Sequence, residues 1–168
     1  MTFIRPVTFF DIDQIQQSLA DSMIAETSNL PLPYPSDGAE KWFEKVSKGI
    51  FEGRQVVFVI ISENQLVGVM SINNINLDKS SASLDYWVSR NDWGKGHATQ
   101  AAKLALNYAR NVLGLSIIDS GCLNRNFGSR RVLEKCGFKF VEELLYSGPF
   151  TNRFYGEFVS RYQIVLQC

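Results

Sequence analysis

The stretch at residues 85–99, DYWVSRNDWGKGHAT, constrains the fold more than any other part of this chain. It begins with YWV, aromatic and β-branched residues that favour a half-buried strand. A polar turn and two glycines, Gly94 and Gly96, follow, and from Ala98 the sequence predicts a helix rich in alanine and leucine. A strand, a glycine loop and a helix start in succession bind phosphate groups well, because the first N–H groups of a helix have no intrahelical partner. A plain strand-to-helix turn is the alternative.

Two familiar phosphate loops do not fit this stretch. A Walker loop has lysine and then serine or threonine after its last glycine, whereas Gly96 is followed by His97 and Ala98. A dinucleotide-binding loop has a third glycine three residues after its second, and here that position is Thr99. The glycine pattern by itself therefore does not name a ligand.

The segments YWV and WGKGHAT resemble the acetyl-coenzyme A loop of the GNAT N-acetyltransferase superfamily, and within it the RimJ/RimL branch. The chain departs from the family pattern at Asn91, where Gln or Arg is common, so one pyrophosphate contact is weakened while the backbone cradle is kept. The resemblance implies that this segment binds acetyl-coenzyme A. The residues so implied are Trp87, Val88, Ser89, Trp93, Gly94, Lys95, Gly96, His97, Ala98 and Thr99.

A second motif at residues 126–138, NFGSRRVLEKCGF, resembles another conserved segment of the same family, with Arg130 at a position that is usually hydrophobic. Physically, Asn126 is suited to cap a helix and Gly137 to end it. The resemblance implies in addition that the Asn126 amide hydrogen-bonds the coenzyme arm and that Ser129 meets the thioester. The cap alone is the alternative for Asn126.

The catalytic groups are less clear than the coenzyme site. Many family members carry a tyrosine at the position of Leu133, which acts as general acid toward the leaving thiolate, and leucine cannot do this. In the RimJ/RimL-like branch the serine matching Ser129 is the suspected substitute, so Ser129 is predicted as the acid. Asp85 is predicted as a catalytic carboxylate, and Asp119 lies on the other relevant strand. A solvent-exposed carboxylate at a strand edge is the alternative for each.

The order of patterned segments, together with the resemblance, predicts one α/β (α+β) domain over residues 1–168 with a GNAT-like fold. We expect a mixed, mostly antiparallel sheet of about six or seven strands with a central parallel pair, flanked by about four helices. Strands are expected at residues 2–7, 55–61, 66–72, 83–88, 115–122, 138–145 and 159–166, with a polar loop at 73–81. Helices are expected from Ile12 to Met23, at 38–51, from Ala98 to Gly114 and from Asn126 to Gly137.

The strands at 83–88 and 115–122 are joined through the glycine loop and a helix, so they can lie parallel. If these two strands splay, each exposes unpaired N–H and C=O groups. The family resemblance implies that the amide-rich pantetheine arm of the coenzyme pairs with these groups like an added strand. A backbone N–H at Val88 or Ser89 can then stabilise the oxyanion of the reaction.

Composition limits the remaining functional classes. The 168 residues contain 17 basic and 17 acidic side chains, so no overall basic field favours nucleic acid. No apolar run approaches the ~20 residues of a membrane span, and the N-terminus lacks a signal-peptide pattern. Cys122, Cys136 and Cys168 lack metal-ligand spacing, and His97 is the only histidine. We expect a cytoplasmic protein without a metal, with reduced thiols and with no nucleic-acid or membrane partner.

The predicted function is acetyl-CoA-dependent transfer of an acetyl group to a primary amine, by direct attack in a ternary complex. The branch resemblance implies a protein N-terminal α-amine, of the ribosomal-protein type, as acceptor. A small amine (polyamine, antibiotic or amino acid) is the alternative acceptor, and a non-catalytic acetyl-CoA-binding module is the alternative function. The first two helices, joined by the proline-rich loop at 29–37 with its exposed Tyr34, can wall an acceptor pocket, and plain core helices with a solvent loop are the alternative. The aromatic loop at 148–156 is expected to cover the acceptor side. A homodimer is left open.

Overall fold

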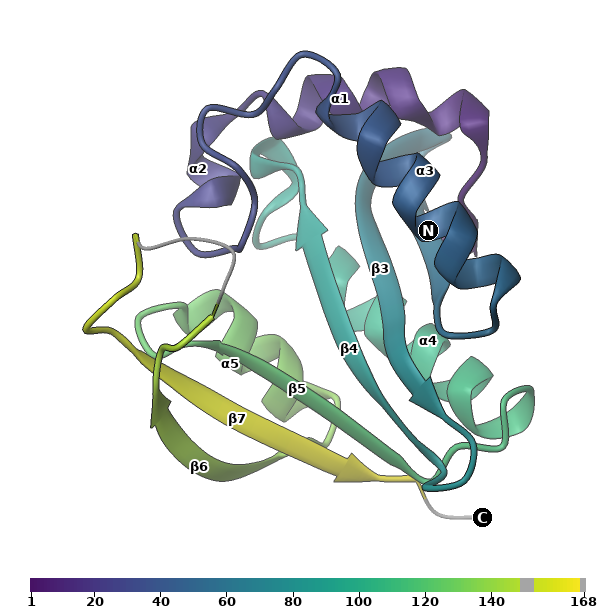
Figure 1. Ribbon diagram of the computed structural model, residues 1–168, viewed down its shortest axis with the longest axis vertical. Coiled ribbons are helices and arrows are strands. Elements are labelled where there is room, and N and C mark those ends of the chain that lie inside the picture. The colour runs from purple at the N-terminus through teal and green to yellow at the C-terminus, as the bar shows by residue number, and fades with distance from the viewer. Residues whose placement is uncertain (149–152, 167–168) are drawn as a thin grey trace.

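The chain folds around one mixed sheet of seven strands, ordered β1-β2-β3-β4-β5-β7-β6, with helices on both faces (Figure 1). The computed structural model describes residues 1–148 and 153–166. The strands are β1 (Thr2–Pro6), β2 (Val56–Ser62), β3 (Gln65–Asn76), β4 (Ser81–Val88), β5 (Ile117–Leu123), β6 (Lys139–Leu145) and β7 (Phe158–Val165). The helices are α1 (Ile12–Leu19), α2 (Ser22–Ala25), α3 (Gly38–Phe51), α4 (His97–Asn111) and α5 (Phe127–Lys135), with short 3-10 helices at Phe9–Asp11 and Arg90–Asp92.

The strand pairing confirms the predicted fold class. Neighbouring strands are antiparallel except β4 and β5, which form the predicted central parallel pair. The described residues contain five α-helices where about four were predicted, because the helix expected from Ile12 to Met23 is divided. α1 ends at Leu19, and the Asp21 side chain accepts a hydrogen bond from the Met23 N–H at 2.9 Å, which starts α2 as a separate helix.

The polar segment at residues 73–81 is only partly the predicted loop. β3 continues to Asn76, where it pairs with Ser81, and its register with β4 shifts after Asn73. Asn74 at this irregularity has a φ of +53°. Asparagine is poor in strand propensity, which led to the prediction of a loop, but pairing with β4 satisfies the backbone and overrides that preference.

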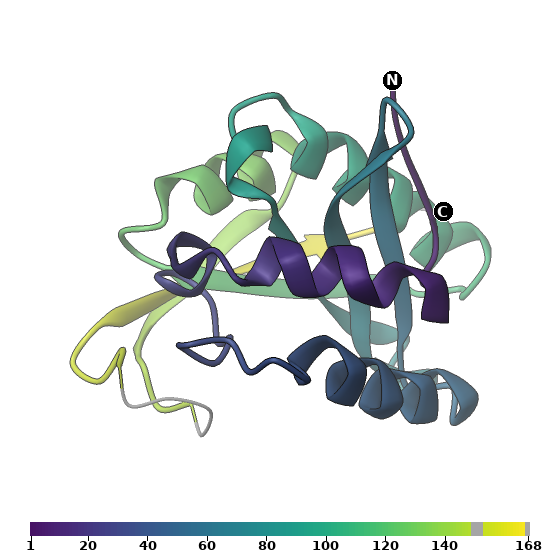
Figure 2. The same ribbon diagram turned by 90° about the horizontal axis from the view of Figure 1, so that it is seen from above.

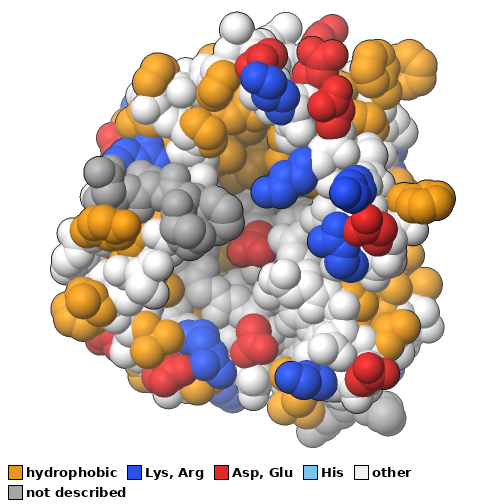
Figure 3. Space-filling model, viewed as in Figure 1, with side chains coloured by type: hydrophobic (Ala, Val, Ile, Leu, Met, Phe, Trp, Pro, Cys, Tyr) orange, Lys and Arg blue, Asp and Glu red, His pale blue; other side chains and the backbone are white. Residues whose placement is uncertain are grey.

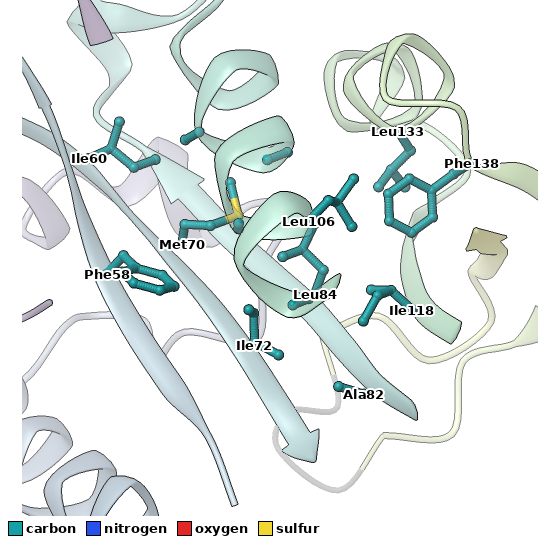
Figure 4. Packing of buried hydrophobic residues seen from close by; sticks show 14 of the residues in the cluster. Phe58, Ile60, Met70, Ile72, Ala82, Leu84, Leu106, Ile118, Leu133 and Phe138 are labelled. Carbon is teal, nitrogen blue, oxygen red and sulfur yellow. The ribbon is translucent and has the colours of Figure 1, made fainter. Parts of the chain in front are cut away.

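Helices α4 and α5 cover one face of the sheet, and α1 and α3 cover the other (Figure 2). On the first face the alanine stripe of α4 lies against the sheet, and Ala101, Ala102, Ala105 and Ala109 are fully buried. Their small side chains allow the helix backbone to approach the strands closely. Leu106 of α4 and Leu133 of α5 are part of this core, which includes residues of β2, β3, β4 and β5 (Figure 4).

β4 and β5 pair only over their first residues and then separate (Figure 1). The last paired residues are Ser83 and Asp119. Immediately beyond them the buried Ser120 hydroxyl donates to the Leu84 carbonyl oxygen at 2.8 Å. Each strand continues to pair on its far side, β4 with β3 and β5 with β7, and among the described residues neither has a strand partner on the side of the gap. The expected splay is therefore present.

Tyr34 differs from its expected exposure. Its ring is half-buried and lies over Gly38 at the start of α3, where an added Cβ would come within 2.7 Å of the ring. Burial raises the pKa of the Tyr34 phenol to about 12. The proline-rich loop therefore packs this side chain onto α3 instead of presenting it to solvent. None of the helices formed by the described residues is long and apolar enough to cross a bilayer.

Candidate active site

The glycine loop between β4 and α4 presents a row of backbone N–H groups. Gly94 and Gly96 have φ values of +76° and +85°, which are strained for any residue with a Cβ. α4 begins at His97, and no side chain caps its first turn. Within the part of the chain that the structure describes, none of the N–H groups of residues 94–99 has an acceptor. These groups and the helix dipole form a cradle for an anion.

The side chains of this loop have partners within the chain. Lys95 Nζ lies 2.9 Å from Asp92 Oδ1, and both groups are partly exposed. His97 Nδ1 lies 2.8 Å from Thr2 Oγ1 of β1, which turns the imidazole toward the sheet edge. Ala98 packs against the core below α4. The groups of this loop that are available to a ligand are therefore its backbone N–H groups.

The end of β4 directs one backbone N–H group into the gap. Ser89 N donates to Val67 O of β3 at 2.8 Å, so the Ser89 N–H is occupied, contrary to its predicted role toward an oxyanion. Successive N–H groups of a strand point in opposite directions, so the Val88 N–H points away from β3 and toward the gap. The Val88 carbonyl accepts from Trp93 Nε1 at 2.7 Å. The Ser89 hydroxyl donates to Ser18 of α1 at 3.2 Å.

The start of α5 brings a serine and a tyrosine together at the gap. Asn126 Oδ1 accepts from Ser129 N at 3.0 Å, which is the predicted helix cap. Ser129 Oγ lies 2.7 Å from the hydroxyl of Tyr86 on β4. Leu133 is completely buried and faces the core, as expected of a residue without a catalytic role. The sequence alone does not indicate a role for Tyr86, because aromatic residues in strands are typical packing residues.

The surroundings of Tyr86 include the hydrophobic core and two thiols. Burial raises the pKa of the Tyr86 phenol well above its usual range, and the hydrogen bond with Ser129 opposes this only in part. Burial also raises the pKa of the neighbouring Cys122 thiol on β5. Cys136 at the end of α5 donates to the Thr99 carbonyl at 3.7 Å and joins α5 to α4. All three groups are therefore neutral near pH 7.

Asp85 lies on the opposite face of the sheet from Tyr86, because adjacent residues of a strand point to opposite faces. Asn73 Nδ2 of β3 donates to Asp85 Oδ2 at 2.8 Å. The carboxyl reaches solvent, but surrounding protein atoms raise its pKa through burial, and the Asn73 hydrogen bond opposes the rise. This face is hollowed near its centre, with acidic side chains in and below the hollow (Figure 3).

Asp119 differs from Asp85 in having a cation beside it. Gln163 Nε2 of β7 donates to Asp119 Oδ1 at 3.0 Å, and Arg161 Nε lies 3.8 Å from the same oxygen. Arg161 also pairs with Glu142 of β6. Asp119 is thus held in a charge network, whereas an amide, Asn73, is the hydrogen-bond donor at the Asp85 carboxylate. Of the two candidate carboxylates, Asp85 is the better suited to meet an incoming amine.

The predicted residues divide between the two faces of the sheet at the gap. The glycine-loop backbone, Asn126 and Ser129 lie on the α4 and α5 side. Asp85 and Trp87 lie on the α1 and α3 side, and Trp87 packs against the core of that side. The gap between β4 and β5 connects the two sets. A ligand bound on one face can thus meet a second ligand from the other face.

The loop after α2 is hydrogen-bonded to two segments that lie far from it in the sequence. The Tyr146 hydroxyl, after β6, donates to Asn29 Oδ1 at 2.9 Å. Arg125 Nη2, before α5, donates to the Glu26 carbonyl at 2.8 Å. The loop after α2 is therefore tied to segments that follow β5 and β6. The predicted aromatic loop lies partly outside the described residues, at 149–152, and its role toward an acceptor stays a prediction.

Sequence comparison identifies the family that shares these features. The family model described as "Acetyltransferase (GNAT) domain" matches residues 2–139, which include β1, the glycine loop and the whole of α5. The chain belongs to the GNAT acetyltransferase family. The predicted family is thereby confirmed, and the predicted enzyme class, an acetyltransferase, is the one for which the GNAT family is named.

Individual GNAT relatives support this assignment. The probable N-acetyltransferase YjcK of Bacillus subtilis is 32% identical over 108 residues, 62% of this chain and 60% of that protein. The ribosomal-protein-serine acetyltransferase of Escherichia coli is 28% identical over 105 residues, 62% of this chain and 58% of that protein. The matches thus span about 60% of the length of these two curated relatives.

A solved GNAT structure shows the same fold over nearly the whole chain. The spermidine N-acetyltransferase from Vibrio cholerae, in complex with CoA and spermine, superposes with a TM-score of 0.83 at 23% identity. The superposition covers 98% of this chain and 95% of that one. In residues 1–148 and 153–166 of the present chain, no group of three or more His, Cys, Asp or Glu side chains is arranged to hold a metal ion.

Proposed function

We propose that this chain, acting as a single domain over residues 1–168, transfers the acetyl group of acetyl-CoA to a primary amine. The observation that carries the proposal is the open gap between β4 and β5, with the N–H groups of residues 94–99 on one side and Asp85 on the other. The gap allows a coenzyme and an acceptor to approach from opposite faces. Holding two reactants in this way supplies a large share of catalysis.

The coenzyme is expected on the α4 and α5 face. Its pyrophosphate fits the cradle at residues 94–99, because these N–H groups have no other acceptor in the described chain. Its pantetheine amides can pair with the free edge of β4 and with the Asn126 side chain, whose Oδ1 caps α5. The thioester then reaches the gap near Ser129. Acetyl-CoA is also consistent with the CoA bound in the Vibrio cholerae relative.

The amine is expected from the α1 and α3 face, on which Asp85 lies. The acceptor must reach the thioester as a neutral amine, and Asp85 can attract the ammonium form and receive a proton from it. The Val88 N–H is directed into the gap and suits the oxyanion of the tetrahedral intermediate. Ser129 is expected to face the leaving sulfur. The orientation of the Val88 N–H and the hydrogen bonds of Asp85 and Ser129 support these proposed roles.

A protein N-terminal α-amine is the acceptor we favour. An α-amino group has a pKa near ~8 and is partly neutral at pH 7, whereas a lysine side chain, with a pKa near ~10.4, needs a stronger base. The Escherichia coli relative is named for a ribosomal protein. A polyamine is the second candidate, because the Asp85 carboxylate, whose hydrogen-bond donor is an uncharged amide, suits a cationic ligand and the Vibrio cholerae relative is a spermidine acetyltransferase.

Thermal unfolding with and without excess acetyl-CoA tests the coenzyme site. Ligand at ~100 times Kd should add about 2.7 kcal/mol to the free energy of unfolding. Thiol release from acetyl-CoA is then followed with a peptide that has a free N-terminal serine, and with spermidine. A thermal shift without thiol release above the rate in buffer would favour the non-catalytic binding module. No shift at millimolar acetyl-CoA would overturn both functions.

A homodimer stays a prediction. Light scattering, which measures the molar mass in solution, tests it.

A further inference from the structure

The hydroxyl groups of Tyr86 and Ser129 form a pair that links β4 to α5. The two oxygens lie 2.7 Å apart, and the Tyr86 hydroxyl also donates to the Ser129 carbonyl oxygen in a longer hydrogen bond of 3.3 Å. The two residues are 43 positions apart in the chain, so the contact depends on the fold. The contact joins β4, which borders the candidate coenzyme site, to Ser129, which is expected to face the thioester.

The direction of this hydrogen bond decides what Ser129 can do. A phenol, with a pKa near ~10, is a much stronger acid than an aliphatic alcohol, so the phenol is the better donor of the two. If Tyr86 donates, Ser129 Oγ accepts, and the Ser129 O–H can donate to another acceptor beside it, of which the Cys122 sulfur is one in the free protein. The phenol is half-buried in the core beside α4 and stays protonated at neutral pH, so it is always available as a donor.

We propose that Tyr86 is a positioning residue, whose O–H donates to Ser129 Oγ and thereby directs the Ser129 O–H toward the coenzyme sulfur. This inference rests on the proposed function, in which Ser129 faces the leaving thiolate. Hydrogen bonds in a chain polarise one another, so donation by Tyr86 strengthens donation by Ser129. The Leu133 position, where the family resemblance implies a tyrosine acid, is filled by a buried leucine. Tyr86 thus brings a phenol to the site from β4.

The chemical step needs only a hydrogen bond from Ser129. When the tetrahedral intermediate collapses, the C–S bond breaks and its electron pair stays on sulfur. A thiol, with a pKa near ~8.5, is a stronger acid than serine, so the sulfur leaves as a thiolate that Ser129 stabilises without losing its own proton. The thiolate takes a proton from solvent, and the proton lost by the amine passes to Asp85 and then to solvent. Tyr86 and Ser129 end the cycle unchanged.

A double-mutant cycle tests this assignment. Tyr86→Phe, Ser129→Ala and the double variant are assayed with acetyl-CoA and the acceptor, peptide or spermidine, that the wild type acetylates. We expect Tyr86→Phe to lower kcat about tenfold, the loss of one hydrogen bond in the transition state, with KM for acetyl-CoA unchanged. In the Ser129→Ala background the same change should have no further effect. Tyr108→Phe, which removes a phenol hydroxyl from α4 in the same core, is the matched control and should leave kcat unchanged.

Several outcomes overturn the inference, and they separate it from the proposed function. A Tyr86→Phe enzyme within twofold of wild-type kcat, or an equal loss of kcat in the Ser129→Ala background, removes the role of Tyr86 and leaves acetyl transfer intact. If Ser129→Ala has the kcat of the wild type, neither the Ser129 hydroxyl nor the Tyr86 hydroxyl has the proposed role. A wild type that transfers to neither acceptor overturns the proposed function and the inference with it. Equal melting temperatures of Tyr86→Phe and Tyr108→Phe exclude misfolding as the cause of a lower kcat.

Discussion

The Ser120 hydroxyl donates to the Leu84 carbonyl oxygen across 2.8 Å, one residue beyond the last pair of β4 and β5. This side-chain bond replaces the strand pairing at the point where the gap opens. Ser120→Ala leaves a buried carbonyl without this donor, so we expect the free energy of unfolding to fall by about 1–3 kcal/mol in urea denaturation. Ser71→Ala is the control, because Ser71 donates to the Asp85 carbonyl at 3.3 Å in an exposed setting. Equal losses in the two variants would contradict the prediction.

Asp85→Asn should make the protein more stable at pH 7 and much less active. Burial raises the pKa of Asp85 in the folded state, so ionisation of this carboxyl opposes folding above the unfolded pKa of ~3.9. Asparagine keeps an acceptor for Asn73 and removes the charge. We expect a higher melting temperature at pH 7, no gain at pH 3, and a rate of amine acetylation lowered by about 10²-fold.

Asp119→Asn is the control for the higher stability and lower activity expected of Asp85→Asn. Asp119 is bound by Gln163 and lies beside Arg161, so removal of its charge takes a partner from a cation and should not raise the melting temperature. Acetylation should be affected much less than in Asp85→Asn. A stabilised and fully active Asp85→Asn protein would remove Asp85 from the proposed mechanism. A destabilised one would contradict the stated direction of its pKa.

Local signals predicted much of the fold and the glycine loop. The bounds of α3, the Asn126 cap and the positive φ of Gly137 agree with the predictions. Each depends on residue types that are favoured at the ends of helices. The predictions that failed depended on competition between local preferences. Apolar residues at helical spacing predicted one helix from Ile12 to Met23, but Asp21 caps a separate second helix. Asn76 was predicted in a loop, but it pairs with β4 and is part of β3.

The contacts that define the candidate site were harder to predict because they join distant segments. Tyr86 and Ser129 each fit a local pattern, a strand aromatic and a helix first turn, and only the packing of α5 against the sheet brings their hydroxyls together. The same holds for Asn73 beside Asp85, since the sequence placed Asn73 in a loop. The resemblance to the GNAT family indicated acetyl-CoA as the ligand, whereas spacing and periodicity alone did not identify a ligand.

Asp11 should contribute to stability in a pH-dependent way. It is buried, which opposes ionisation, but hydrogen bonds from Arg5 at 2.7 and 2.9 Å and from Thr8 lower the pKa of its carboxyl overall. This stability is present above the unfolded pKa of ~3.9 and is lost as pH falls through the lower folded value. Asp11→Asn should therefore lower the free energy of unfolding by about 1–3 kcal/mol at pH 7.

The matched control for this prediction is Asp13→Asn, an exposed aspartate in the first turn of α1 that should change stability by less than ~0.5 kcal/mol. Urea denaturation of both variants at pH 7 and pH 3 provides the measurement. The difference between wild type and Asp11→Asn should shrink at pH 3. A difference that stays constant between the two pH values would assign the loss to packing and not to the charge of Asp11.

Gly96→Ala and Gly114→Ala should separate backbone strain from coenzyme binding. Both glycines have a left-handed φ, +85° and +66°, and at neither would an added Cβ meet another atom within 4 Å. The methyl group therefore strains the backbone without a clash, and each variant should lose about 1–2 kcal/mol of stability. Gly114 follows the far end of α4, whereas Gly96 is the N-cap beside the free N–H groups. We expect Gly96→Ala alone to weaken acetyl-CoA binding, by at least tenfold in isothermal titration. Equal affinities in the two variants would show that the loop is only a turn.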